Sequence, residues 1–78
     1  MPTVLRHKGY RFFFFSLDRP EPIHIHVEKG EKYAKFWLNP ISVARSHGFR
    51  DHELREIVGI IKDHLPILEE HWHEFFSC

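Results

Sequence analysis

The chain has 78 residues, and its eleven Lys and Arg residues are balanced by eleven Asp and Glu residues, so its formal net charge is zero. This length predicts a single domain over residues 1–78 that buries only about 60% of its unfolded surface. The balanced charge argues against a strongly basic nucleic-acid binder, although a local basic face is compatible with it. The longest apolar run, Phe12 to Phe15, is far too short to span a bilayer.

Cysteine and histidine usage bears on the compartment and on pH. Cys78 is the only cysteine, so neither an intramolecular disulfide nor a cysteine-based zinc site can form, which suits a reducing compartment. The first residues hold no apolar run of signal-peptide type, because Arg6 follows directly after Val4 and Leu5. We therefore expect a cytoplasmic protein with no membrane partner. Eight histidines predict that its charge rises as the pH falls through about 6.5.

Two strands are predicted first, over residues 3–6 and 10–16, with Gly9 at a positive φ in the turn between them. The second strand is rich in aromatic residues, which is typical of strands. Its rings from Phe12 to Phe15 alternate in direction, so both faces of the strand are apolar. We expect helices to cover one face and a loop, a second subunit or a partner to cover the other.

The clearest strand signal is the strict alternation of apolar and polar residues over 23–28, which follows two prolines. Gly30 suits the left-handed position of a hairpin turn, and a returning strand is predicted over 32–38. The alternation divides the side chains of both strands into two sets. The core set is Ile23, Ile25, Val27, Ala34, Phe36 and Leu38, and the other, exposed face carries His24, His26, Tyr33, Lys35 and Trp37.

Helical signals follow. Asn39 suits an N-cap, Pro40 the first helical position and Gly48 a C-terminal stop, so a short helix is predicted over 40–47. Asp51 is expected to cap the main helix, whose apolar residues recur at three- and four-residue steps up to Phe75.

The main helix is expected to be interrupted. As one rod, residues 51–76 would be about 39 Å long, whereas a globule of this chain length is about 30 Å across. Pro66 also removes a backbone donor and clashes with the preceding turn. We predict a kink or break near Leu65, after which the last segment folds back or projects toward a partner. The apolar surface of such an interface would be Trp72, Phe75 and Phe76.

These elements together predict an α+β fold. An antiparallel sheet of about four strands is followed by a short helix and a longer C-terminal helix, kinked near Pro66, and the helices pack on one face of the sheet.

His24 and His26 are the main candidates for chemistry, and their interpretation is open. Histidine is tolerated on the polar face of any half-exposed strand, so the pair can be without function. Histidines two residues apart on a strand can also hold one divalent metal such as zinc. A third ligand would have to come from Asp18, Glu21, Glu28 or a helix histidine. Outside this metal hypothesis we expect no cofactor.

Metal-free acid–base chemistry on RNA is a further hypothesis. It needs a neutral and a protonated group near the scissile phosphate, together with a cation for the developing charge. His24, His26 and Lys35 would be the catalytic groups, and Arg11, Tyr33 and Trp37 would bind the substrate, the two aromatic rings by stacking on bases. A weaker version of this hypothesis is that the same residues bind RNA without cleaving it. The chain has no glycine-rich phosphate loop, HExxH motif or nucleophile elbow, so the sequence leaves open whether it is an enzyme.

Several segments resemble a bacterial family described as domain of unknown function 4160. The matching segments are Met1-Pro2-Thr3-Val4, residues 9–14, Pro22-Ile23-His24-Ile25-His26-Val27, residues 34–38, Gly48-Phe49 with Glu53-Leu54, and Trp72. The pair Glu21-Pro22 stands where members more often have two prolines, and Pro66 departs from the plain helix expected there.

The resemblance implies a place in a two-gene module. Members often look like one half of a pair with a small protein of the domain of unknown function 2442 family, an arrangement similar to toxin–antitoxin operons. The leading hypothesis is therefore a toxin–antitoxin-like component that acts on RNA or on a cognate protein through the His24/His26 face. The competing hypotheses are a non-catalytic module that binds protein or nucleic acid with a regulatory role, and a metal-binding protein. The expected partners are the cognate small protein encoded nearby or a second copy in a homo-oligomer, with RNA as a further candidate.

Overall fold

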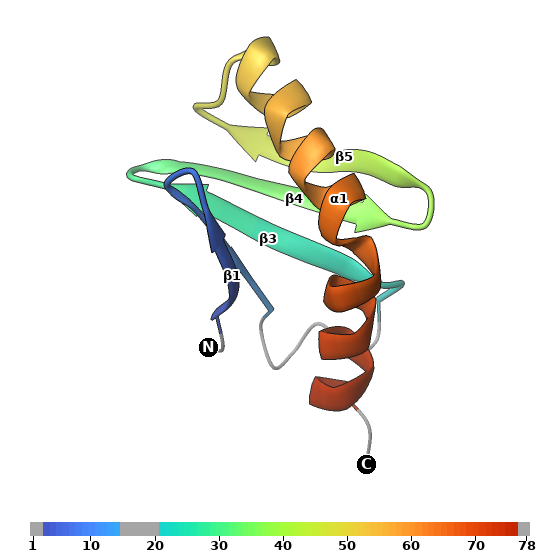
Figure 1. Ribbon diagram of the computed structural model, residues 1–78. Coiled ribbons are helices and arrows are strands. Elements are labelled where there is room, and N and C mark those ends of the chain that lie inside the picture. The colour runs from blue at the N-terminus through green and yellow to red at the C-terminus, as the bar shows by residue number, and fades with distance from the viewer. Residues whose placement is uncertain (1–2, 15–20, 77–78) are drawn as a thin grey trace.

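The fold was obtained as a computed structural model that describes residues 3–14 and 21–76. These residues form one antiparallel sheet and one long helix (Figure 1). The elements are β1 (Thr3–His7), β2 (Tyr10–Phe13), β3 (His24–Lys29), β4 (Lys32–Leu38), β5 (Ile41–His47) and α1 (Asp51–Phe76). The predicted α+β class is confirmed, with five strands instead of about four.

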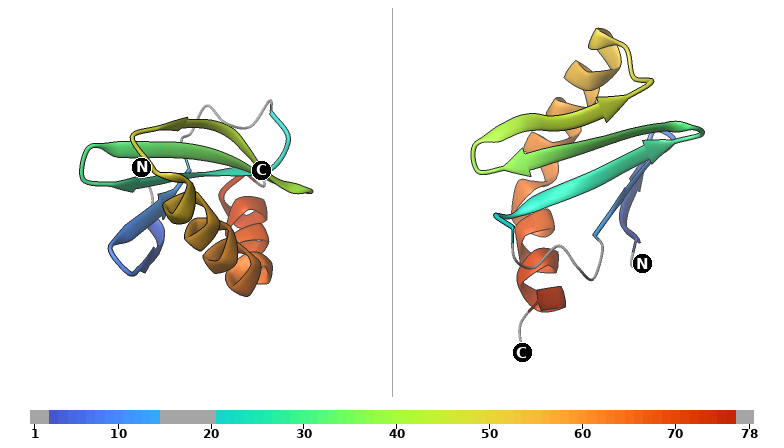
Figure 2. Two further views of the ribbon diagram at one scale, coloured as in Figure 1. Left: turned by 90° about the horizontal axis from the view of Figure 1, so that it is seen from above. Right: turned by 180° about the vertical axis from the view of Figure 1, so that it is seen from behind.

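The strands lie side by side in chain order, β1-β2-β3-β4-β5, and each is antiparallel to its neighbours. The helix α1 lies across one face of this sheet, as predicted (Figure 2). Short connections suffice for such an arrangement, because an antiparallel pair needs only a tight turn. Gly9 and Gly30 take positive φ in two of these turns, as the sequence predicted.

The core lies between the sheet and α1. Register places Ile25 opposite Phe36 and Val27 opposite Ala34, and all four side chains are fully buried, which confirms the core set predicted for β3 and β4. From the helix, the buried apolar residues are Ile57, Ile60, Ile61, Leu68 and Trp72. Apolar burial of this kind supplies most of the favourable free energy of folding, at about 25 cal/mol per Å².

Strand β2 is covered on both faces, as predicted. Phe12 and Phe14 belong to the core, and Phe13, which points to the other face, is only 2% exposed. The ring of Phe13 lies 5.5 Å from that of His26, and the guanidinium of Arg11 lies 4.4 Å from its centroid. The predicted end of this strand, including Phe15, lies outside the described residues.

The helix predicted over residues 40–47 is wrong, because this segment is strand β5. Asn39 and Pro40 form the connection between β4 and β5 and are joined by a cis peptide bond. Asparagine and proline favour turns as well as helix starts, and pairing with β4 satisfies one edge of the β5 backbone. Gly48 does have a positive φ of 87°, but it ends a strand rather than a helix.

Helix α1 starts with Arg50, not Asp51, at the cap position. The carbonyl oxygen of Arg50 accepts hydrogen bonds from the amides of Glu53 and Leu54 at 2.9 and 3.0 Å. The Glu53 carboxylate reaches back to accept the Arg50 amide proton at 2.9 Å, the second half of a capping box. Lys32 donates to the other Glu53 oxygen at 2.7 Å, and these two hydrogen bonds, that of Lys32 first, lower the pKa of the Glu53 carboxyl.

The predicted break near Leu65 is wrong, because α1 continues through Pro66 to Phe76. The molecule is elongated, with a longest dimension of 37 Å instead of the expected value of about 30 Å, and the bent helix extends along this dimension. The helix axis bends in its middle (Figure 1), which is the remaining trace of the predicted kink. No helix in the described part of the chain is long and apolar enough to cross a membrane.

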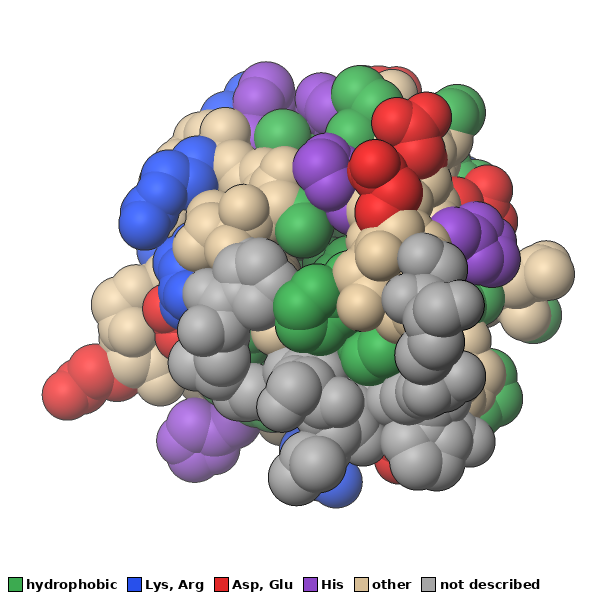
Figure 3. All heavy atoms as spheres, turned by 90° about the horizontal axis from the view of Figure 1, so that it is seen from below, with side chains coloured by type: hydrophobic (Ala, Val, Ile, Leu, Met, Phe, Trp, Pro, Cys, Tyr) green, Lys and Arg blue, Asp and Glu red, His purple; other side chains and the backbone are tan. Residues whose placement is uncertain are grey.

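The end of α1 carries the aromatic residues that were predicted to form an interface. Trp72 is buried, with its ring 5.2 Å from that of Phe14 and 4.3 Å from that of Phe76. Phe75 stays 39% exposed. Apolar side chains lie among acidic and histidine side chains in the view from below (Figure 3). A partner at this end therefore stays a prediction, and it concerns Phe75 more than Trp72.

Candidate functional site

The histidine motif lies on β3, the middle strand, so β2 and β4 decide which side chains surround it. On β4, Trp37 lies opposite His24 and Lys35 opposite His26. On β2, Phe13 lies opposite His26. All the predicted site residues therefore share the sheet face that points away from the core, which we name the second face. They are Arg11, His24, His26, Tyr33, Lys35 and Trp37.

His24 is fully buried, so the expectation of an exposed imidazole is wrong. Its Nδ1 lies 2.8 Å from the carbonyl oxygen of Pro22, and because a carbonyl oxygen only accepts, Nδ1 carries the proton. Its Nε2 lies 3.7 Å from a carboxylate oxygen of Glu21. The ring is also in edge contact with Trp37 and Trp72, at 5.6 and 5.2 Å between centroids. A bound substrate could therefore contact His24 only after the side chains around the ring move.

His26 is 4% exposed, and it is held between two aromatic rings. Phe13 and Tyr33 both lie nearly parallel to it, at 5.5 and 5.9 Å between centroids. Its Nδ1 is 2.7 Å from the Tyr33 hydroxyl. The His24 ring meets it edge-on at 5.0 Å. The two imidazoles thus form part of a packed aromatic layer on the second face.

The cations expected to stabilise phosphate charge already have carboxylate partners. Lys35 donates to Glu21 at 2.5 Å, and its ammonium lies 4.7 Å from the centroid of Trp37. Arg11 donates to Glu28 at 2.6 Å. Glu21, which the sequence suggested only as a metal ligand, joins Lys35 to His24. A phosphate would have to compete with these carboxylates for both cations.

Tyr33 and Trp37, the predicted stacking platform, are both partly buried. One side of the Tyr33 ring is occupied by His26 and one side of the Trp37 ring by the Lys35 ammonium. Stacking on a base requires an open ring face. Both residues therefore have less surface to offer than the sequence suggested.

The metal hypothesis lacks a third ligand in the described part of the chain. Within residues 3–14 and 21–76, no group of three or more His, Cys, Asp and Glu side chains could hold an ion. The Nδ1 atoms of His24 and His26 are engaged with Pro22 and Tyr33, so an ion would have to compete with these groups for both atoms. Asp18, one of the candidate third ligands, lies outside the described residues.

A second polar cluster joins β2 to α1, and sequence reasoning missed it. The Tyr10 hydroxyl donates to Glu56 at 2.7 Å, and the Lys29 ammonium lies 4.7 Å from the Tyr10 ring. Burial, followed by the hydrogen bond and charge of Glu56, raises the pKa of Tyr10 to about 12. Because the partners are 46 residues apart, only the folded chain brings them together, and the cluster acts as a structural clamp.

Comparison with known proteins identifies the family. The family model described as Domain of unknown function (DUF4160) matches residues 9–73, which include β2 to β5 and most of α1. The chain belongs to the DUF4160 family. No curated protein and no solved structure matches this DUF4160 member. The resemblance seen in the sequence is therefore confirmed, and the family description assigns no activity.

Proposed function

We propose that this chain is a non-enzymatic, partner-binding component of a toxin–antitoxin-like two-gene module, and that it acts by docking a cognate small protein. In this proposal His24 and His26 hold the second face together and perform no chemistry. The observation that carries it is the burial of both imidazoles, at 0% and 4% exposure, with their Nδ1 atoms engaged by groups of the same chain. A general acid or base must come within hydrogen-bond reach of its substrate.

The small size of the chain and its exposed edge strand support a binding role. A chain of 78 residues has a small core, and such domains gain stability when they associate with a partner. Strand β5, one of the two edge strands, is exposed along most of its length. An exposed strand edge offers unpaired backbone groups to another chain.

Action on RNA is the second candidate, and one observation favours it. The Glu21 carboxylate lies between the Lys35 ammonium and the His24 Nε2, an arrangement of acid, base and cation at the rim of the second face. If Glu21 moved away from Lys35 and His24, the groups exposed would be suited to phosphodiester cleavage. Catalysis would then require the imidazoles themselves.

The deciding experiment uses the double variant His24→Asn/His26→Asn. The amide nitrogen and oxygen of asparagine can occupy the place of Nδ1 and keep the hydrogen bonds to Pro22 and Tyr33, but asparagine cannot exchange protons near neutral pH. We expect the natural chain and this variant to bind the neighbouring gene product equally well and to leave RNA intact. Binding is measured by co-purification and by mass in solution.

Two outcomes contradict the proposal. RNA cleavage by the natural chain that is lost in the folded double variant would establish catalysis by the histidines. If the chain remains a monomer when mixed with the neighbouring gene product, the proposed partner binding is excluded. Growth of a bacterial host on induction of each chain gives the same distinction in the cell, and metal analysis of untagged protein tests the remaining hypothesis of a histidine-bound ion.

A further inference from the structure

Helix α1 crosses the strands of the sheet instead of running along them, and it contacts both edge strands, β5 and β1 (Figure 1). One helix about 10 Å across therefore covers only a band of the core face. The core formed with α1 is built on β2, β3 and β4. Val43, which points from β5 toward the helix side, is 44% exposed. The β5 side of this face is therefore incompletely covered.

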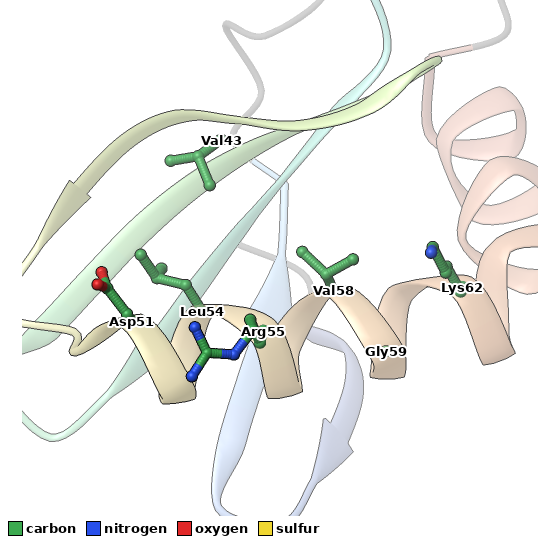
Figure 4. A pocket seen from close by; sticks show the side chains of 7 residues that line it. All are labelled: Val43, Asp51, Leu54, Arg55, Val58, Gly59 and Lys62. Carbon is green, nitrogen blue, oxygen red and sulfur yellow. The ribbon is translucent and has the colours of Figure 1, made fainter.

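An open groove of about 550 Å³ lies between β5 and the first half of α1 (Figure 4). Its apolar floor is made by Val43, Leu54 and Val58, whose side chains point toward one another from the strand and the helix. It follows α1 from Asp51 to Lys62, a length of about 16 Å. A partner helix of about three turns has this length.

Gly59 lies in the same groove and has no explanation within the chain. Glycine inside a helix costs about 1 kcal/mol relative to alanine, and a Cβ atom on Gly59 would meet nothing within 4 Å. Helix axes in packed pairs lie about 8–10 Å apart, and the distance depends on the side chains at the contact. A glycine at this position allows another helix to approach α1 closely.

The charges along the groove define the partner further. Arg55 and Lys62 are exposed, seven residues apart on α1, and neither has an ion-pair partner among the residues that the structure describes. Asp51 lies at the other end of the groove. An occupant with acidic residues two turns apart beside its apolar side chains would match Arg55 and Lys62, and a basic residue at one end would match Asp51.

A second copy of the chain fits this groove poorly. In the described residues the chain has one helix, and the apolar face of that helix is already buried on its own sheet. Pairing of β5 with β5 of a second copy would extend the sheet sideways and leave the groove above it open. A helix supplied by a different protein fits without unpacking either chain.

We propose that the groove lined by Val43, Leu54, Val58 and Gly59 docks an amphipathic α-helix of a partner protein that has acidic residues beside its apolar stripe. The inference rests on the proposed partner-binding function and gives that function a surface. This surface lies on the opposite side of the sheet from His24 and His26.

The test uses the full chain and two synthetic helical peptides. Both peptides have the same apolar residues at i, i+3, i+4 and i+7, and the flanking positions hold Glu in one and Lys in the other. We expect the Glu peptide to bind the natural chain as a helix. Gly59→Leu should weaken that binding by about tenfold or more, since the new side chain projects into the groove, and its Cβ atom meets nothing within 4 Å in the free fold.

Charge reversal supplies the sharper measurement. Arg55→Glu/Lys62→Glu should reverse the preference, so that the Lys peptide binds more tightly than the Glu peptide. The matched control is Arg6→Glu/Arg45→Glu, which changes the net charge equally at exposed positions on the second face. Equal loss in the control would show nonspecific attraction between charges and overturn the proposal.

Other results also overturn it. If Gly59→Leu protein binds the Glu peptide with unchanged affinity, the groove is not the binding site. If the bound peptide is not helical, the proposal of a docked helix is wrong. A natural chain that is a dimer and dissociates on Gly59→Leu shows a second copy in the groove. If the cognate neighbour binds both the natural chain and Gly59→Leu equally, the proposed function stands and this surface fails; if it binds neither, the proposed function itself fails.

Discussion

The two motif histidines differ from surface histidines in what their removal leaves behind. His24 lies among Trp37, Trp72 and His26, and its Nδ1 proton is held by the Pro22 carbonyl. Removal of the ring leaves both a cavity and an unpaired carbonyl. The Pro-x-His-x-His pattern is thus tied to stability in this chain through the packing of the second face.

We expect His24→Ala to lower the free energy of unfolding by about 2–4 kcal/mol, because a buried ring and its hydrogen bond are lost. His24→Asn keeps a donor near Pro22 and should lose only about half as much. Denaturant unfolding measures both, with His47→Ala, at an exposed position, as a control expected to stay within about 0.5 kcal/mol. An equal, small effect of all three substitutions would contradict a structural role of His24.

Tyr10 predicts the response of stability to alkaline pH. Its pKa in the folded chain is raised to about 12 by burial and by Glu56, above the unfolded value of about 10. The folded state therefore holds the phenol proton more tightly, so the stabilisation is complete below pH 10 and is lost as the pH rises toward 12.

Absorbance of the phenolate should show that Tyr10 titrates late, and Tyr10→Phe should remove this late transition. The alkaline loss of stability should become smaller in the same variant. A Tyr10 that titrates near pH 10 in folded protein would show that the contact with Glu56 is not maintained in solution.

At the scale of elements, α1 is the least expected result, because one helix continues where two separate arguments predicted a break. Pro66 is exposed and lies inside the helix, where it removes one hydrogen bond of the helix. Packing before and after it, by Ile61 and Leu68, keeps both halves on the same core. Tertiary burial therefore outweighs the local cost of proline.

Pro66→Ala should accordingly raise the free energy of unfolding by about 1–3 kcal/mol, since the hydrogen bond returns and the clash disappears. The fluorescence of Trp72 should stay the same if the bend of the helix does not depend on the proline. Thermal unfolding and fluorescence measure the two effects. A less stable variant with a shifted Trp72 spectrum would instead show that Pro66 sets the bend that brings Trp72 to the sheet.

For the molecule as a whole, the last turns of α1 contact side chains from both faces of the sheet. Trp72 contacts Phe14, a core residue, and also His24, a residue of the second face. The helix thus passes the end of the sheet at the place where both sets of side chains meet. The aromatic layer around His24 and the apolar core are joined there.

Trp72→Ala should therefore raise amide hydrogen exchange most over residues 68–76 and at the start of β3, and less in β4. We expect a loss of about 3–5 kcal/mol in the free energy of unfolding, as for other buried tryptophans. Phe75→Ala, at a 39% exposed position, is the control and should change exchange only locally. Uniformly faster exchange in all strands would show that the molecule opens as a single unit.

The hairpin of β3 and β4, the two faces of these strands and the apolar stripe of α1 could be predicted from the sequence alone. These features depend on alternation, helical period and turn glycines, which act over a few residues. The same alternation placed His24, His26, Tyr33, Lys35 and Trp37 on one face, because register follows from it. Arg11 joins this face only through the pairing of β2 with β3.

The remaining features depend on contacts between segments that are distant in the sequence. Residues 40–47 carry signals for both a helix start and a strand, and the free edge of β4 selected the strand. The burial of His24 comes from Trp72, 48 positions away in the sequence, and the groove beside Gly59 exists only because β5 and α1 lie side by side. Local patterns fix which way a side chain points, whereas exposure and cavities depend on contacts between distant segments, and only the folded chain supplies these contacts.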